Sequence, residues 1–377
     1  MKDSAACTKS RRRQILIYGY SRMNLGDDLF FKILVERYPT VDFYMLSEVD
    51  YRKIIHAPNF HLIRRNRINK IFAAHIPYQF YFKRFDAVIC IGGSIFMEVG
   101  ESGRCRFTRF LIDYKRKFPG VPIHIIGSNY GPARTSAFRE SVNGIFSFVD
   151  SVCLRDSASY NIFKANRSVT YAPDVIFQLG NAVADTERTE QSGVVGFSVI
   201  DLPSRSNLCQ YAEPYEEFLV YHIRKSIEEG KRVRLFSFCD YERDVEACNR
   251  LIDRVELPLR DRVEIVPYNG DIEAFLALFR GVDMLFASRF HAAVLGILYR
   301  IPTVPVVYSD KTINVLNDLK YGGDIVDIRN MGDIHRSLRV EVLDSVAVEA
   351  LSRESQTQFR GVDRMLGEER VNTDSAV

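Results

Sequence analysis

Short apolar segments alternate along the chain with longer amphipathic segments, and this pattern predicts strands separated by helices. The apolar segment 14–18 ends in a glycine-containing loop, and we expect a helix over 29–37 and a second strand over 41–46 to follow it. A strand, a helix and another strand in this order are typical of a parallel sheet. The same alternation of apolar and amphipathic segments predicts strands at 87–91, 123–126 and 151–154 and helices at 136–148 and 157–164.

The polar segment 181–192 lacks apolar periodicity and is expected to link two domains. After it the alternation of strands and helices resumes. Strands are expected at 194–199, 233–238, 263–266, 284–287 and 303–307. Helices are expected at 213–229, 241–254, 271–279, 291–299 and 311–319. The sequence therefore predicts the α/β class, with two Rossmann-like domains that face each other across a cleft, the GT-B-like architecture of many glycosyltransferases. Ligands are expected where the carboxyl ends of the strands meet.

The chain has 377 residues, a length that suggests two domains. We expect an N-terminal Rossmann-like domain over 14–180 and a C-terminal one over 193–335. A flexible basic tail over 1–13, a helical segment over 336–366 and a second tail over 367–377 complete the expected organisation.

Charge and cysteine content exclude several classes of protein. The 51 basic and 48 acidic residues give a formal charge of +3, which argues against a nucleic-acid partner. The longest apolar segments are far shorter than the ~20 residues of a membrane-spanning helix. None of the seven cysteines lies in a CxxC pair, so no zinc or other metal site is indicated, and this usage suits a reducing, cytoplasmic compartment.

The segment Ser288-Arg289-Phe290-His291 carries the strongest candidate chemistry, because it follows a predicted strand and begins a predicted helix. Arginine and a helix N-terminus both bind carboxylate or phosphate. Histidine transfers protons near neutral pH. The structural alternative is that Ser288 caps the helix and Arg289 pairs with a surface acid.

Two further cations follow predicted strands. Arg155 ends the strand of the first domain at 151–154, and Lys311 begins a helix of the second domain. Each has a structural alternative, an Arg155–Asp156 pair and a solvated lysine. Arginines from both domains in one cleft favour a doubly anionic ligand.

Glycine-rich turns follow two strands of the first domain. Gly92, Gly93 and Ser94 end one strand, and Asp27 and Asp28 close the loop after the first. Glycine permits close approach of a ligand to the backbone. Neither turn matches the dinucleotide or Walker fingerprints. The two aspartates are more often helix caps, although one of them at a cleft could accept a proton from a sugar hydroxyl.

Seven segments in this order resemble the polysaccharide pyruvyl transferase family, over residues 14 to about 320. They are GYSRMNLGDD (19–28), DAVICIGGS (86–94), GSNYGP (127–132), LRDSAS (154–159), APD (172–174), SRFHAAVLG (288–296) and IPTVPVVYSDK (301–311). The resemblance implies transfer of a pyruvyl group from phosphoenolpyruvate to a sugar, usually as a ketal across two hydroxyls, with no cofactor besides that co-substrate. It implies that Arg289, His291 and Arg155 are donor-site residues and, more loosely, that Lys311, Ser94 and Asn129 belong to the site. Together with the positions of the residues after strands, this leads us to expect a catalytic role for His291 and Asp27 and donor binding by Arg155, Arg289, Lys311, Ser288 and Asn129. An acceptor or loop role is expected for Asn24, Gly26, Asp28, Gly92, Gly93 and Ser94.

We expect His291 to donate the proton that C3 of phosphoenolpyruvate gains, since the bound anions would raise its pKa. The acceptor is expected to be a bacterial surface polysaccharide or its lipid-linked precursor, bound on the N-terminal domain. Two alternatives remain open. A nucleotide-sugar glycosyltransferase would need an acidic ribose contact, for which the second domain offers no convincing residue. A non-catalytic glycan-binding module would be expected to lose the SRFH segment first.

The stretch 51–85 holds eight Lys or Arg residues, no acid and seven interleaved Phe or Tyr residues after Tyr51. Such a pattern suits an anionic membrane surface, which would place the protein peripherally on the inner face of the cytoplasmic membrane. A solvated helix with core aromatics is the alternative, and it is slightly favoured.

Overall fold

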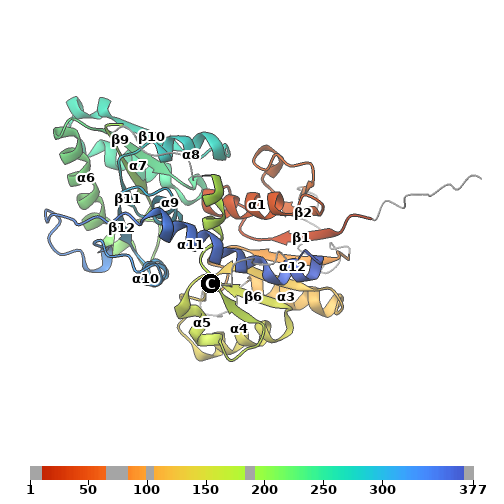
Figure 1. Ribbon diagram of the computed structural model, residues 1–377. Coiled ribbons are helices and arrows are strands. Elements are labelled where there is room, and N and C mark those ends of the chain that lie inside the picture. Colours follow the sequence, from red (N-terminus) through yellow and green to blue (C-terminus); the bar gives the residue numbers. More distant parts are fainter. Residues whose placement is uncertain (1–10, 65–83, 99–105, 183–191, 369–377) are drawn as a thin grey trace, which may run out of the picture.

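The computed structural model describes residues 11–64, 84–98, 106–182 and 192–368. Two parallel sheets with helices on their faces lie side by side (Figure 1). The first sheet has the strand order β3-β2-β1-β4-β5-β6-β7. Its strands are β1 (Gln14–Tyr18), β2 (Asp42–Ser47), β3 (Phe60–Arg64), β4 (Ala87–Ile91), β5 (Ile123–Ser128), β6 (Ser151–Leu154) and β7 (Val169–Tyr171).

The helices of this first unit begin at capped positions. Asn24 accepts a hydrogen bond from the Gly26 amide at the start of α1 (Leu25–Arg37), and Thr135 and Asp156 cap α4 and α5 in the same way. The helical elements are α1, η1 (Tyr51–Lys53), α3 (Arg106–Lys117), α4 (Ser136–Phe148), α5 (Ser157–Phe163) and η3 (Val175–Ala182).

The second sheet has the strand order β10-β9-β8-β11-β12-β13. Its strands are β8 (Val194–Val199), β9 (Arg232–Ser237), β10 (Val263–Pro267), β11 (Met284–Ala287), β12 (Thr303–Val307) and β13 (Val326–Asp327). Its helical elements are η4 (Cys209–Tyr211), α6 (Ala212–Glu228), η5 (Asp240–Glu242), α7 (Asp244–Asp253), η6 (Leu257–Arg262), α8 (Ile272–Arg280), α9 (Phe290–Leu298), α10 (Asp310–Asp318) and η7 (Ile328–Asn330).

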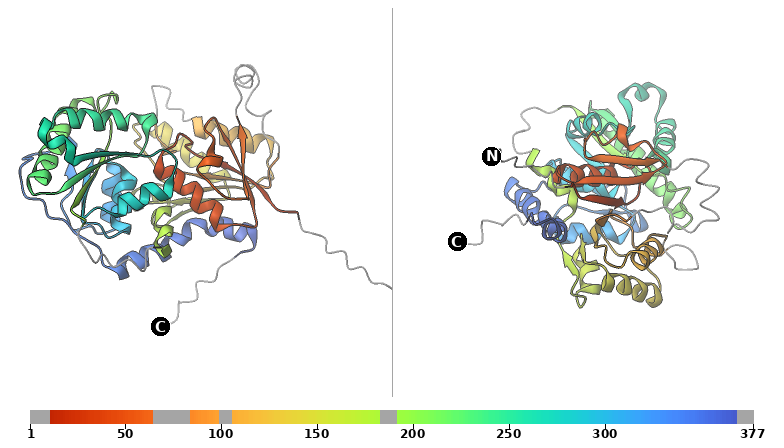
Figure 2. Two further views of the ribbon diagram at one scale, coloured as in Figure 1. Left: turned by 90° about the horizontal axis from the view of Figure 1, so that it is seen from above. Right: turned by 90° about the vertical axis from the view of Figure 1, so that its right-hand side faces the viewer.

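The C-terminal helices cross back from the second unit to the first, as the blue ribbons of Figures 1 and 2 show. They are α11 (Ser345–Ser355), η8 (Gln356–Phe359) and α12 (Arg360–Leu366). Gln358 accepts a hydrogen bond from the Gly127 amide at 2.8 Å, and Asp363 accepts from Arg37 at 3.0 Å and from Tyr38 at 2.6 Å. These contacts fix the C-terminal segment against β5 and α1.

One buried apolar cluster runs through both units. It joins Phe30 and Phe31 of α1 to Phe236 and Phe238 at the end of β9 and to Phe290 of α9. The backbone amide of Leu25 also donates to the carbonyl of Phe238 at 3.1 Å. The N-terminus of α1 is therefore packed directly against the second unit, and it brings the strand ends of both sheets together.

The predicted α/β class with two facing Rossmann-like domains is confirmed. Four local elements were predicted wrongly or not at all. Helix α1 begins at Leu25, so Gly26, Asp27 and Asp28 lie in its first turn rather than in a loop. Strand β3, helix α3 and strand β13 were not predicted.

The proposed domain boundaries stay predictions. Most of the expected N-terminal tail, the core of the linker 181–192 and most of the tail 367–377 lie outside the described residues, as do residues 65–83 of the basic stretch. In the rest of that stretch, Tyr51, Phe60 and Phe85 are buried core residues. None of the described helices is long and apolar enough to cross a membrane.

Candidate functional site

Arg155 lies at the centre of the candidate site, directly after β6, and only 2% of it is exposed. Its Nη2 donates to Asn129 Oδ1 at 2.6 Å, and its Nη1 donates to Asp174 Oδ2 at 3.0 Å. The guanidinium then reaches across the domain interface, where its Cζ lies 3.9 Å from the ring centre of Phe290. The Nε atom is buried without a hydrogen-bond partner.

Gly93 makes room for this guanidinium. A Cβ atom at position 93 would lie 2.4 Å from Arg155 Nη1, closer than real Cβ atoms approach a neighbour. The glycine turn after β4 is therefore required by a side chain of the protein itself, as well as by any ligand that approaches there.

His291 lies in the first turn of α9, within 3.4 Å of Arg155 through its Nε2 atom. Since arginine can only donate, Nε2 accepts and carries no proton in this arrangement. Burial lowers the pKa of His291 well below its ordinary value, and the nearby charges of Arg155, Lys311 and Arg289 lower it further. The imidazole is therefore neutral at physiological pH.

The ring of His291 packs against the N-terminus of α1. A Cβ atom at Gly26 would lie only 1.7 Å from its Nδ1, and the ring of Phe30 meets it edge-on at 5.3 Å. Gly26, for which an acceptor or loop role was predicted, thus provides the surface against which the imidazole is held.

Asp27 follows Gly26 and is partly buried beside Gly92. Its carboxyl has no hydrogen bond to any described residue. Burial raises its pKa to about 8, and the charges of Asp28 and Glu242 act in the same direction, while Arg155 and Lys311 oppose them. Asp27 is thus a protonated carboxyl at neutral pH, and its neighbour in the chain, Gly26, packs against the neutral imidazole of His291.

Lys311, in the first turn of α10, connects the second unit to the first sheet. Its Nζ donates to Ser94 Oγ at 3.3 Å, and Ser94 in turn donates to Asn129 Oδ1 at 3.5 Å. The structure therefore brings together Asp27, Ser94, Asn129, Arg155, His291 and Lys311, which we call the interface cluster.

Arg289 is placed differently. It is buried, and its guanidinium binds Asp244 in a bidentate pair and Glu242 at 2.6 Å. Glu242 also accepts from Arg205 at 2.7 Å and from Tyr20 of the first unit at 3.2 Å. The partners of Arg289 are thus interface acids, not a surface acid as the structural alternative assumed, and its contact with a donor stays a prediction.

Three other predicted residues have structural contacts. Asn24 caps α1, and Ser288 Oγ accepts a hydrogen bond from Tyr215 at 2.9 Å. The fully buried carboxyl of Asp28 accepts from Tyr51 at 2.7 Å and from Tyr268 of the second unit at 2.8 Å. Asp28 therefore joins the two units, and each of its carboxyl oxygens already accepts a hydrogen bond from a tyrosine of the protein.

Sequence reasoning missed the acids that hold the two arginines. Asp174 was within the quoted APD segment but had no assigned role, and Glu242 and Asp244 follow the predicted strand 233–238 in the segment CDYERD. Acids directly after a buried strand were the available signal.

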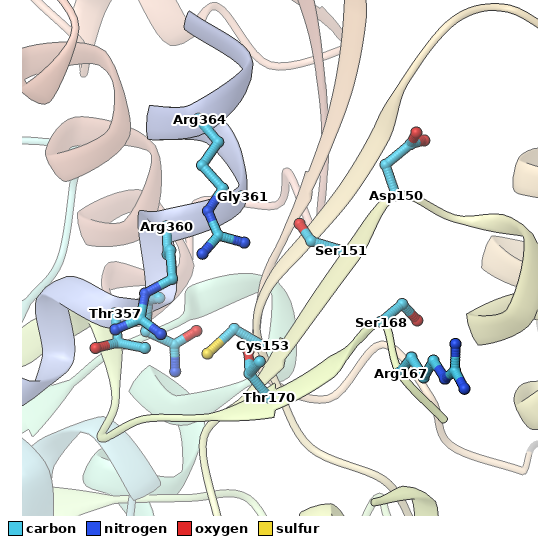
Figure 3. Close-up of a pocket in the computed structure, with 11 residues that line it drawn as sticks. Asp150, Ser151, Cys153, Arg167, Ser168, Thr170, Thr357, Arg360, Gly361 and Arg364 are labelled. Atoms are coloured by element: carbon cyan, nitrogen blue, oxygen red, sulfur yellow. The ribbon is translucent and has the colours of Figure 1, made fainter. Parts of the chain in front are cut away.

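A separate pocket of about 100 Å³ lies at the amino ends of β6 and β7, away from the interface cluster (Figure 3). Arg360 and Arg364 extend into it from α12, whereas Arg167 points away. No residue of the interface cluster lines it. Among the described residues, no group of three or more His, Cys, Asp or Glu side chains is placed to hold a metal ion.

Solved structures with a similar fold span nearly the whole chain at very low identity. The UDP-N-acetylglucosamine 2-epimerase from Rickettsia bellii matches with a TM-score of 0.54 and 8% identity, covering 95% of this chain and 97% of that one. Anabaena Alr3699/HepE, solved in complex with UDP and glucose, matches with a TM-score of 0.52 and 12% identity, covering 95% and 100%. These similarities establish the fold alone.

Sequence similarity is more specific. The amylovoran biosynthesis protein AmsJ of Erwinia amylovora is 25% identical over 306 residues, which cover 72% of each chain. A family model described as polysaccharide pyruvyl transferase matches residues 24–310, a range that includes every residue of the interface cluster except Lys311. Because that match covers well over half of the chain, the protein belongs to the polysaccharide pyruvyl transferase family.

Proposed function

We propose that this protein transfers a pyruvyl group from phosphoenolpyruvate to a sugar of a bacterial surface polysaccharide or its lipid-linked precursor, and leaves a pyruvate ketal. The observation that carries the proposal is the interface cluster itself, where cations from both sheets surround a neutral imidazole and a protonated carboxyl. The relative in amylovoran biosynthesis supports a polysaccharide as the product class.

The charges of the site suit a donor with two anionic groups. Arg155 is neutralised by Asp174, and Arg289 and Arg205 together are neutralised by Asp244 and Glu242. Lys311, in contrast, has no ion pair with any described residue, and Asp27 is uncharged near neutral pH. The site therefore carries a surplus of positive charge, which favours an anion at low cost in reorganisation.

The reaction requires one proton at C3 of phosphoenolpyruvate and the removal of one from each of two sugar hydroxyls. We assign the first transfer to Asp27, because its raised pKa keeps the proton available at neutral pH. As C3 gains the proton, the first hydroxyl oxygen bonds to C2, and neutral His291 accepts the hydroxyl proton.

In the second stage the bond between C2 and the phosphate oxygen breaks, and its electron pair leaves with the phosphate. The second hydroxyl oxygen then bonds to C2 and closes the ketal, while its proton passes to the departing phosphate. The expectation that His291 itself protonates C3 stays a competing assignment, since bound anions raise the pKa of an imidazole.

A direct test is to incubate the protein with phosphoenolpyruvate and a panel of synthetic or lipid-linked glycosides in D2O. The expected product is a ketal whose methyl group carries one deuterium, formed with one equivalent of phosphate. Both are measured by NMR and mass spectrometry. His291→Gln is the matched inactive control.

A second arm compares thermal stabilisation by phosphoenolpyruvate and by nucleotide sugars, since a ligand that binds the native state raises its stability. Stabilisation by nucleotide sugars alone, with glycosyl transfer and no ketal, would replace the proposal with the glycosyltransferase alternative. Binding of glycans without any turnover would support the binding-module alternative.

A further inference from the structure

Tyr308 has an environment unlike that of other tyrosines in the described part of the chain. It directly follows β12, at the carboxyl end where the site residues of the second sheet gather. Lys311 Nζ lies 5.6 Å from the centre of its ring, and Arg205 Cζ lies 5.8 Å from it. Its hydroxyl forms no hydrogen bond with any described residue, and the side chain is half-buried.

The cations around this phenol dominate its electrostatics. Burial would raise the pKa of Tyr308, but Lys311, Arg289 and Arg205 together lower it below the ordinary value. The one opposing acid is Glu242, which is itself paired with Arg289 and Arg205. Tyr215 of the same unit shows the usual behaviour, since burial raises its pKa.

Hydrogen-bonding capacity is left over at the same place. Lys311 donates one hydrogen bond to the neutral Ser94, and its two remaining N–H groups have no described acceptor. Ser309, next to Tyr308, has a buried Oγ without a partner. Buried polar groups normally find partners, so unused donors beside surplus positive charge point to an anionic ligand.

We propose that Tyr308, Lys311 and Arg205 form a phosphate subsite, in which the Tyr308 hydroxyl donates to a phosphate oxygen. The identity of the donor as phosphoenolpyruvate rests on the proposed function, but the phosphate chemistry of the subsite does not. A lysine ammonium, an arginine and a hydroxyl that approach from different side chains suit the three terminal oxygens of a phosphate.

The position of the subsite also orients the donor. Lys311 is linked through Ser94 and Asn129 to Arg155, and Arg155 lies beside His291. We infer that C2, C3 and the carboxylate of the donor extend from the subsite toward these groups, where proton transfer must take place. The phosphate at Tyr308 then leaves toward Lys311 and Arg205, and the negative charge that develops on the bridging oxygen is stabilised there.

The test uses two probes on the full-length protein, inorganic phosphate and pyruvate, with isothermal titration calorimetry. Pyruvate keeps the carboxylate of the donor and lacks its phosphate. For Tyr308→Phe we expect the affinity for phosphate and for phosphoenolpyruvate to fall by about tenfold or more, as for a lost hydrogen bond to a charged group. The affinity for pyruvate should stay within about twofold of wild type.

Tyr221→Phe is the matched control, because Tyr221 lies on α6 and its hydroxyl also has no described hydrogen bond. Lys311→Gln is a second variant, expected to lose phosphate binding more strongly, and it keeps the test valid if Tyr308→Phe folds poorly. Circular dichroism melting confirms that each variant is folded.

Unchanged phosphate affinity in folded Tyr308→Phe, or an equal loss of pyruvate affinity, overturns the subsite. If wild type converts phosphoenolpyruvate to the ketal while Tyr308→Phe binds phosphate normally, the subsite is wrong and the proposed function stands. If phosphate binding depends on Tyr308 but phosphoenolpyruvate is not consumed, the subsite stands and the proposed function is wrong.

Discussion

Replacement of Asp27 by Asn separates catalytic use of this carboxyl from its effect on stability. The substitution keeps the size of the side chain and removes its ionisation. In the folded protein the pKa of Asp27 is raised from its ordinary value of 3.8 to about 8, chiefly by burial. A group with this environment opposes folding whenever the unfolded chain would ionise it, so the variant should be more stable than wild type.

The size of the effect follows from proton linkage. Between pH 3.8 and about 8 the folded state keeps a proton on Asp27 that the unfolded state has released. The stability that protonated Asp27 contributes to the folded state is fully present below pH 3.8. It is lost by ~1.4 kcal/mol per pH unit as the pH rises from there to about 8. Partial hydration of the carboxyl reduces that limit, and we expect the Asn variant to be ~2–4 kcal/mol more stable than wild type at pH 8, with a difference close to zero below pH 4.

The assay is urea unfolding at several pH values, followed by circular dichroism because the chain has no tryptophan. Asp253→Asn is the matched control, since the side chain of Asp253 is 77% exposed. The stability difference between Asp27→Asn and wild type should rise with pH and level off above pH 8. The control should show a difference close to zero throughout.

Turnover should change in the opposite direction. If Asp27 supplies the proton to C3, the Asn variant should lose ~100-fold or more in kcat, in the range of general acid catalysis. A difference in stability that does not vary with pH would contradict the raised pKa. A stabilised variant with normal turnover would leave the pKa intact and return the acid role to His291.

Three further predictions concern other parts of the site and the surface. His291→Gln should reduce turnover by ~100-fold or more with little change in donor affinity, as measured by steady-state kinetics and calorimetry. Gly93→Ala should displace the Arg155 guanidinium and weaken phosphoenolpyruvate binding by about tenfold or more, whereas Gly144→Ala, where a Cβ meets nothing within 4 Å, should not. If the stretch 51–85 binds anionic lipid, sedimentation with acidic liposomes should weaken as salt rises and disappear on charge reversal of its arginines, and indifference to lipid charge would refute membrane binding.

The sequence predicted best those elements whose local pattern agrees with the tertiary environment. Strands such as Ala87–Ile91 and Thr303–Val307 are buried on every residue, so the first is an uninterrupted apolar segment and the second is apolar apart from Thr303. In β3, by contrast, Phe60 is buried while His61 and Leu62 are only partly so, and the strand stands inside a basic and aromatic stretch. The alternation of apolar and polar residues that predicts a strand was therefore not recognisable in the sequence of β3.

The start of α1 shows why the site could be only partly predicted. Gly26 followed by two aspartates has the composition of a loop, yet Asn24 caps a helix there and places Gly26 under the His291 ring. The requirement for glycine comes from a side chain 265 positions away in the sequence. Arg155 and His291 were identifiable from their places after strands, but the acids that neutralise Arg289 depend on contacts made only in the folded chain.

The arrangement of charge suggests why the cations of the site come from both domains. Each arginine is buried with its own acid, which removes the large cost of an isolated buried charge and leaves its orientation fixed. Lys311 has only a neutral partner, and that partner, Ser94, belongs to the opposite sheet. The unpaired positive charge thus lies where the two units meet, beside the carboxyl of Asp27. An anion bound there would contact both units at once, so in the proposed reaction the interaction that binds the donor would also hold the two units, and with them Asp27 and His291, together.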